Sequence, residues 1–246
     1  MNRTVKIALI AAAALALLAA NYFLMAEVFF GPPAEVKAAL RSDAAVTIQR
    51  RDNGGWLAYQ PASPIGTGLI LYPEGYQDIR MYAPLCRRVA EQGYTVVMLS
   101  RREKVPPTFE QEEARVAAAR AAFPGVTRWF IGAHTWEANL AAAYALRHED
   151  ELAGVVLWAG RLSPETSLAA SALPVLNVYG TRDDQNENLV AANTPLLPAG
   201  VQWVAIEGGN RVGFANFGPM PRDVGASISP QEQQAQAAAA TVEFMR

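Results

Sequence analysis

The chain has few of the residues that build covalent cross-links and metal sites. Its 246 residues include one cysteine and two histidines. A single cysteine excludes an intramolecular disulfide and a zinc site built from cysteines. Cys86 lies in a helical pattern whose apolar residues share one face, which favours packing in the core over a reactive thiol.

The chain also lacks a marked excess of positive or negative charge. The formal net charge is −2, and the basic residues are scattered along the chain. A nucleic-acid-binding surface needs a basic stripe, so we expect no nucleic-acid partner. No Gly-x-Gly-x-x-Gly or other phosphate-cradling loop occurs, and no spacing of His, Asp and Glu resembles a metal site. We therefore expect neither a cofactor nor a metal ion.

A long apolar run occupies the N-terminus. Residues 7–26 contain one strongly polar residue, Asn21, and follow Arg3 and Lys6. About 20 helical residues rise about 30 Å, enough to cross a bilayer core. We expect a single-pass anchor within residues 1–30, with the N-terminus inside and the domain extracytoplasmic, because positive charge precedes the run and Glu27 follows it. The alternative is a signal peptide that is cleaved to release a secreted domain, with residues 7–20 as its apolar segment.

The rest of the chain alternates between strand-like and helix-like patterns. A linker with a short helix is expected at residues 31–44, and one domain at residues 45–246. Strands are predicted at residues 45–49, 56–59, 68–72, 95–99, 128–131, 154–159, 175–179 and 201–206. Helices are predicted at residues 81–92, 108–122, 135–148, 186–192 and 229–245. This order predicts an α/β fold, in which helices cover both faces of a mostly parallel central sheet, preceded by the N-terminal hydrophobic helix.

The turn after the fifth predicted strand carries the most specific motif. Residues 129–138, WFIGAHTWEA, read as a strand, a tight turn and a helix, which resembles the Gly-x-Ser-x-Gly nucleophile elbow. The resemblance extends through residues 67–72, 83–97, 179–183 and 206–221. Residues 45–246 thus resemble the small dienelactone-hydrolase-like branch of the α/β-hydrolase superfamily. That resemblance implies a nucleophile at Thr135, a triad acid at Asp183 and a triad histidine at the position of Arg211.

The same resemblance implies an oxyanion loop at residues 72–75. Its residues would be Glu74 and Gly75, with Trp136 following the nucleophile position.

The triad positions carry the wrong chemistry for a proton relay. A guanidinium stays protonated and offers only donors, so Arg211 cannot act as a general base. The two histidines, His134 and His148, both precede Asp183, whereas the histidine follows the acid in these enzymes. We expect a structural role for His134 and a helix-capping role for His148.

The remaining positions leave two hypotheses open. Thr135 keeps a hydroxyl, but a β-branched residue is poorly suited to the positive φ of an elbow, and Glu137 adds bulk where the motif has glycine. We therefore expect an altered elbow. Asp183 and its neighbour Asp184 have the simplest interpretation as solvated loop residues. The alternative pairs Asp183 with Arg211 in an ion pair that replaces the acid–histidine contact.

The sequence therefore predicts a non-catalytic, membrane-anchored hydrolase homologue with a binding or structural role. The alternative is an active hydrolase of small esters or lactones that uses Thr135 in a modified mechanism, with Glu137 as a possible base. A small acyl or carboxylate ligand is a further expectation, because Arg211 and the amides that begin the next helix offer donors. Glu74, Glu137 and Asp183 oppose a bound anion.

Overall fold

The N-terminal segment is described only in part. The computed structural model describes residues 5, 15–18, 31–51, 55–75, 77–100, 108–183, 188–218 and 224–246. Contacts divide the chain into Met1–Ala34 and Glu35–Arg246, and the second part carries the sheet. Most of the predicted N-terminal helix lies outside the described residues. Within residues 1–30, the described residues are Val5 and residues 15–18, and these are helical. Within the described ranges, no helix is long and apolar enough to cross a membrane.

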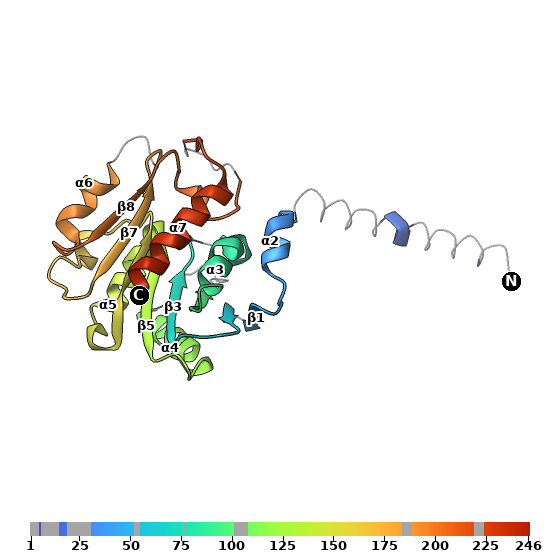
Figure 1. The fold of residues 1–246 in the computed structure, drawn as a ribbon, viewed down its shortest axis with the longest axis horizontal. Coiled ribbons are helices and arrows are strands. Elements are labelled where there is room, and N and C mark those ends of the chain that lie inside the picture. The colour runs from blue at the N-terminus through green and yellow to red at the C-terminus, as the bar shows by residue number, and fades with distance from the viewer. Residues whose placement is uncertain are drawn as a thin grey trace. The chain divides into compact units, whose positions relative to one another are not determined.

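Eight described strands form one sheet (Figure 1). They are β1 (Val46–Arg51), β2 (Trp56–Pro61), β3 (Thr67–Tyr72), β4 (Thr95–Leu99), β5 (Arg128–His134), β6 (Leu152–Trp158), β7 (Val175–Gly180) and β8 (Gln202–Ile206). Their order is β1-β2-β4-β3-β5-β6-β7-β8. β2 is antiparallel to both β1 and β4, and every other neighbouring pair is parallel. The predicted mostly parallel sheet is confirmed.

Helices cover both faces of the sheet, as predicted. They are α2 (Ala34–Ala39), α3 (Ala83–Ala90), α4 (Phe109–Ala122), α5 (Ala138–Ala145), α6 (Leu189–Asn193) and α7 (Pro230–Met245). Alternate residues of β3 serve opposite faces: Leu69 and Leu71 pack in one core cluster with α3 and α7, and Ile70 and Tyr72 in another with α4 and α5. A strand buried on both faces has a continuous apolar sequence, which is why residues 68–72 carry no polar alternation.

Helix starts follow from local capping chemistry. Thr108 and Gln111 form a capping box at the start of α4, and Ser229 and Glu232 form another at the start of α7. These are the positions at which the sequence predicts both helices to begin. Cys86 is fully buried in α3, and burial raises the pKa of its thiol, so this cysteine packs as an apolar residue.

The short helix α2, expected within a linker, packs against the domain. Val36 is fully buried in the core cluster that contains α3 and α7. The carboxylate of Glu35 accepts hydrogen bonds from the side-chain amide nitrogens of Asn216 and Gln231, each at 3.1 Å. The domain therefore begins before the expected boundary at residue 45.

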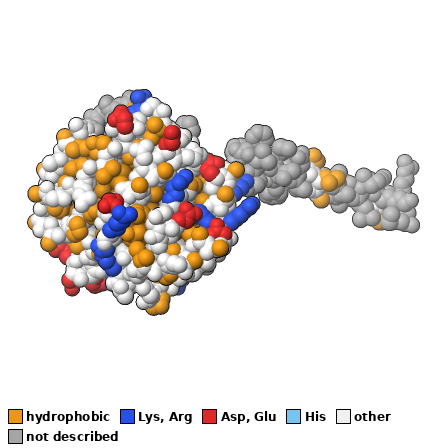
Figure 2. All heavy atoms as spheres, viewed as in Figure 1, with side chains coloured by type: hydrophobic (Ala, Val, Ile, Leu, Met, Phe, Trp, Pro, Cys, Tyr) orange, Lys and Arg blue, Asp and Glu red, His pale blue; other side chains and the backbone are white. Residues whose placement is uncertain are grey.

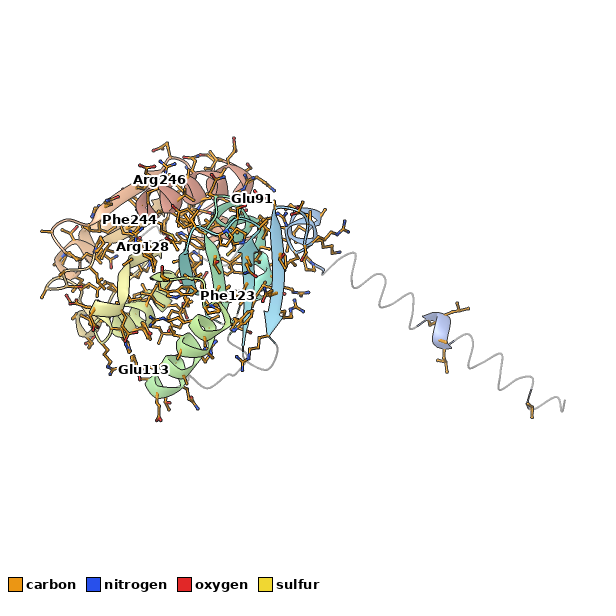
Figure 3. All side chains as sticks on the ribbon, turned by 60° about the horizontal axis from the view of Figure 1, so that its bottom comes forward. Glu91, Glu113, Phe123, Arg128, Phe244 and Arg246 are labelled. Atoms are coloured by element: carbon orange, nitrogen blue, oxygen red, sulfur yellow. The ribbon has the colours of Figure 1, made fainter. Side chains whose placement is uncertain are left out.

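The C-terminal helix closes onto the beginning of β5. Arg128 donates hydrogen bonds from Nη1 to the carbonyl oxygens of Met245, at 2.7 Å, and Arg246, at 3.0 Å (Figure 3). Its guanidinium lies 4.9 Å from the ring centre of Phe130, which packs edge-on against Phe244. These contacts fix the end of α7 beside the sheet.

On the face shown in Figure 2, acidic and basic side chains are interspersed.

Candidate functional site

The candidate site lies at the carboxyl edge of the parallel strands. Loops that follow β3, β5, β7 and β8 carry the residues that the sequence singles out. In such sheets ligands bind where strands end and helices begin. The structure adds one further loop, residues 159–163 after β6. β5 also runs to His134, beyond its predicted end at residue 131, so the motif begins inside the sheet.

Thr135 has the positive φ of a nucleophile in an elbow, although a β-branched residue is poorly suited to it. It has a φ of 57° and connects β5 to the short 3-10 helix Thr135–Glu137 that precedes α5. The strand that leads to this turn is closely packed. At Gly132, a Cβ atom would lie 2.4 Å from the carbonyl oxygen of Val156, so β5 and β6 approach without room for a side chain. Thr135 is fully buried, and within the described part of the chain its hydroxyl has no hydrogen-bond partner.

His134 lies in the core beneath this turn. Its Nδ1 is 2.8 Å from the hydroxyl oxygen of Tyr82, and its Nε2 is 2.9 Å from the carbonyl oxygen of Arg211. Burial lowers the pKa of His134 to about 3, so the imidazole is neutral at ordinary pH. Both ring nitrogens are engaged, which agrees with the structural role that the sequence predicts.

A ring of contacts joins His134 to both flanking loops. The backbone amide of Glu74 donates to the Tyr82 hydroxyl at 2.9 Å. The Tyr82 hydroxyl can then donate its proton to Nδ1 of His134. The neutral ring carries its own proton on Nε2, which donates to the backbone carbonyl oxygen of Arg211. The guanidinium of Arg211 closes the ring through an ion pair with the Glu74 carboxylate.

Arg211 and Asp183 do not form the expected ion pair. Arg211 pairs with Glu74, whereas Asp183 pairs with Arg161, whose Nη2 lies 3.4 Å from Oδ1 of Asp183. The alternative interpretation of Asp183 as a solvated residue is also wrong, because its side chain is 1% exposed and that of Arg161 is 6% exposed. Asp184 lies outside the described residues. The acid position is thus held by an arginine from the loop after β6.

Three asparagines fix the loop that carries Arg161. The side chain of Asn177 accepts a hydrogen bond from the backbone amide of Gly160 and donates one to its carbonyl oxygen, each at 3.1 Å. The side chain of Asn193 donates to the same carbonyl oxygen at 3.2 Å. Asn139 donates to the carbonyl oxygen of Arg161 at 3.1 Å. The backbone amide of Arg161 in turn donates to the carbonyl oxygen of Thr135 at 3.0 Å. Sequence reasoning missed Arg161; the one local signal was an asparagine within the apolar strand β7.

The predicted oxyanion-loop residues have different environments. The amide of Glu74 already donates to Tyr82, as described above, and Gly75 has a φ of 47°. Trp136 is 58% exposed beside the elbow. Glu137 is buried at the beginning of α5.

The second histidine lies outside this group. His148 follows α5, and its imidazole contacts the carboxylates of Glu151, at 3.1 Å, and Glu113, at 3.3 Å. It also stacks on Tyr144, with ring centres 4.2 Å apart. The expected capping contact is therefore replaced by contacts between side chains. Across the ranges that the structure describes, no group of three or more His, Cys, Asp and Glu is placed to hold a metal ion.

Comparison with known proteins agrees with this architecture. Residues 68–235 match the Alpha/beta hydrolase family, and the chain belongs to that family. No curated protein matches the sequence. Solved structures with the same fold include the following three. A predicted CIB-like hydrolase from Thermoplasma acidophilum has a TM-score of 0.58 and 14% identity, over 81% of this chain and 97% of that one.

The other two structures are similar in the same range. A putative dienelactone hydrolase from Klebsiella pneumoniae has a TM-score of 0.54 and 19% identity, over 82% of this chain and 98% of that one. A membrane phospholipase A, described as a bacterial virulence factor, has a TM-score of 0.62 and 17% identity, over 99% of both chains.

Proposed function

We propose that this chain is a non-catalytic member of the α/β-hydrolase family with a binding or structural role. The observation that carries the proposal is the pairing at the triad positions. Asp183 is held by Arg161, and Arg211 is held by Glu74. Neither arginine can accept a proton, so the relay that activates a hydroxyl nucleophile lacks its base.

The only histidine near Thr135 does not supply that base. His134 has both ring nitrogens engaged, and its lowered pKa makes it a poor proton acceptor. The Thr135 hydroxyl is also fully buried, so an ester carbonyl has no direct approach to it. Both observations support a site that does not run hydrolysis.

A second candidate function is hydrolysis of small esters or lactones by Thr135. The positive φ of Thr135 favours this alternative, because the conformation that presents a nucleophile is retained. Glu137, buried two positions further along, would have to act as the base.

The proposed role includes attachment to a membrane. The support is the apolar run at residues 7–26 with Arg3 and Lys6 before it, which favours a single-pass anchor with an extracytoplasmic domain. Cleavage and secretion are the alternative. Fractionation of cells that express the full chain or a chain from residue 31 distinguishes them: an anchored protein enters the membrane fraction only with residues 1–30. A small acyl or carboxylate ligand at Arg211 completes the proposal, which includes no nucleic-acid partner.

Hydrolysis assays decide between the two functions. The full chain is assayed with p-nitrophenyl acetate, a small lactone and phospholipid vesicles, the last because one similar structure is that of a membrane phospholipase A. The wild type and Thr135→Ala are compared, together with labelling by a fluorophosphonate probe. We expect no turnover above the Thr135→Ala background and no labelling. Turnover that disappears in Thr135→Ala would establish the second function.

A further inference from the structure

The two edge strands of the sheet differ in charge. They are β1 and β8, and among the described strands β1 pairs only with β2, and β8 only with β7 (Figure 1). β1 ends with Arg50 and Arg51, both exposed, and charged side chains on an edge strand oppose pairing with a further strand. β8 contains no charged residue and no proline, so its edge lacks these common obstacles to pairing.

The uncharged surface extends beyond β8 itself. Residues 188–206, which include α6 and β8, contain no Asp, Glu, Lys, Arg or His, although 18% of the chain is charged. Trp203 of β8 is partly exposed, and its ring packs edge-on against Tyr179 of β7, with ring centres 6.0 Å apart. Gln202 and Ala205 are exposed. Partly exposed aromatic residues in a segment without charge are typical of the centre of a protein–protein interface.

We propose that β8 is the contact between two copies of this chain, which pair their β8 strands antiparallel about a two-fold axis at Val204. An edge strand offers a row of backbone N–H and C=O groups, and a second copy of the same strand supplies the matching row. An axis at Val204 pairs all five residues of each strand. This contact does not depend on whether Thr135 is catalytic.

Side-chain size fits this register. Residues directly opposite one another lie on the same face of an antiparallel pair. With the axis at Val204, the large ring of Trp203 lies opposite the small Ala205 of the second copy, and Gln202 lies opposite Ile206. An axis at Trp203 would instead place two indoles opposite each other and leave two residues of each strand unpaired.

Charge favours a second copy over a charged partner. A strand from an acidic or basic protein would find no opposite charge on residues 188–206. Glu207 is the first charged residue after this segment. In the proposed register its two copies lie at opposite ends of the strand pair, about 20 Å apart, which exceeds the Debye length at physiological ionic strength. No like charges on the paired strands therefore face each other.

The mass of the full chain in detergent solution, measured by sedimentation equilibrium, tests the proposal. We expect a dimer. Ala205→Glu places an anion on the exposed edge, opposite Trp203 of the second copy, and should raise the dissociation constant of the dimer at least about tenfold. Gln202→Glu, at the other exposed position of β8, should act in the same direction. Thr47→Glu adds the same charge at an exposed position of β1 and should leave the dimer unchanged.

A cysteine at the proposed axis tests the register. Directly opposite residues of an antiparallel pair have Cα atoms about 4.5–5.5 Å apart, which is within the span of a disulfide. The native Cys86 is fully buried, so it does not compete with a thiol introduced on β8. We expect oxidised glutathione to cross-link Val204→Cys at least about tenfold faster than Thr47→Cys, although Thr47 is the more exposed position.

Three outcomes would overturn the proposal, with circular dichroism used to check that each variant is folded. A monomeric wild type would mean that two copies do not pair, whether the edge stays free or takes a strand from another protein. A dimer that persists in both Ala205→Glu and Gln202→Glu would place the contact elsewhere, as association through residues 1–30 would. Equal cross-linking rates for Val204→Cys and Thr47→Cys would indicate random collision.

Discussion

The hydroxyl oxygen of Tyr82 and Nδ1 of His134 lie 2.8 Å apart in the core, beneath the turn where a hydrolase of this family presents its nucleophile. Through this contact, two loops at opposite sides of the site share one buried imidazole. Tyr82 holds the amide of Glu74, and His134 holds the carbonyl of Arg211. His134, which precedes the nucleophile position, therefore has a structural role.

Removal of the Tyr82 hydroxyl should destabilise the fold. Tyr82→Phe leaves the Glu74 amide and the His134 ring nitrogen without their partner, and an unpaired buried polar group costs about 1–3 kcal/mol. We expect the free energy of unfolding to fall by roughly 2–4 kcal/mol in urea denaturation. Tyr59→Phe is the matched control, because the hydroxyl of Tyr59 is buried without a hydrogen-bond partner among the described residues. That variant should be neutral or stabilising, and equal losses in both would contradict the role given to Tyr82.

His134 should make stability depend on acid. Burial lowers its pKa from 6.5 to about 3, so the unfolded chain binds a proton more readily between these pH values. The stability that His134 contributes is therefore complete above about pH 6.5 and is lost as the pH falls toward about 3, at about 1.4 kcal/mol for each unit of pKa shift. The free energies of unfolding of the wild type and His134→Gln should differ most near neutral pH and converge in acid.

The second histidine provides the control for this experiment. His148 contacts Glu113 and Glu151 and takes no part in the ring of contacts around His134, so His148→Gln is a matched histidine replacement that leaves that ring intact. A difference between the wild type and His134→Gln that stays constant from about pH 7 to about pH 4 would rule out a titrating role for His134.

The fold could be predicted because short segments of the sequence carry the signals for core strands and for helix starts. β3 and β4 are continuous apolar runs, and the capping boxes at Thr108 and Ser229 mark helix starts within the sequence itself. Boundaries were less accurate where tertiary packing decides them. Residues 135–148 were predicted as one helix, but the structure divides them into a 3-10 turn and α5. The positive φ of Thr135 was likewise set by its surroundings and not by its own preference.

The candidate site was predicted less well, because its pairings are long-range. Sequence order predicts that Thr135, Asp183 and Arg211 lie at one sheet edge, and they follow strands β5, β7 and β8 of the parallel part of the sheet. It does not specify which carboxylate each arginine takes. Arg161 belongs to a loop with no motif, and it reaches Asp183 only because buried asparagines fix that loop. Charge pairing in a crowded site depends on distances that spacing along the chain does not encode.

The pair between Arg161 and Asp183 should show strong energetic coupling. Breaking a buried ion pair from one side leaves a charge without compensation, at a cost of about 3–5 kcal/mol. We expect Arg161→Met and Asp183→Asn each to lower the free energy of unfolding by about that amount, and the double variant to recover most of the loss. A double-mutant cycle measured by urea denaturation gives the coupling energy. Additive losses would mean that the two side chains do not stabilise one another.

The same pair should decide whether catalysis can be restored. Thr135→Ser combined with Arg211→His supplies a serine and a histidine at the family positions, and Glu74→Ala removes the carboxylate that loses its arginine. In this triple variant Arg161 still holds Asp183, so the acid is not available to orient the new imidazole. We expect no turnover of p-nitrophenyl acetate. Adding Arg161→Ala removes this arginine from Asp183, and hydrolysis should then rise above the background by about tenfold or more.

Two matched variants separate this mechanism from a general loosening of the site. Adding Asp183→Asn to the quadruple variant should remove the gained activity, because an amide does not stabilise the imidazolium that forms during acyl transfer. Replacing Arg161 alone in the wild-type background should give no activity, since the base is still missing there. If the triple variant hydrolyses the ester while Arg161 is present, Arg161 is not what holds the triad acid out of use, and the pairing with Asp183 is only structural.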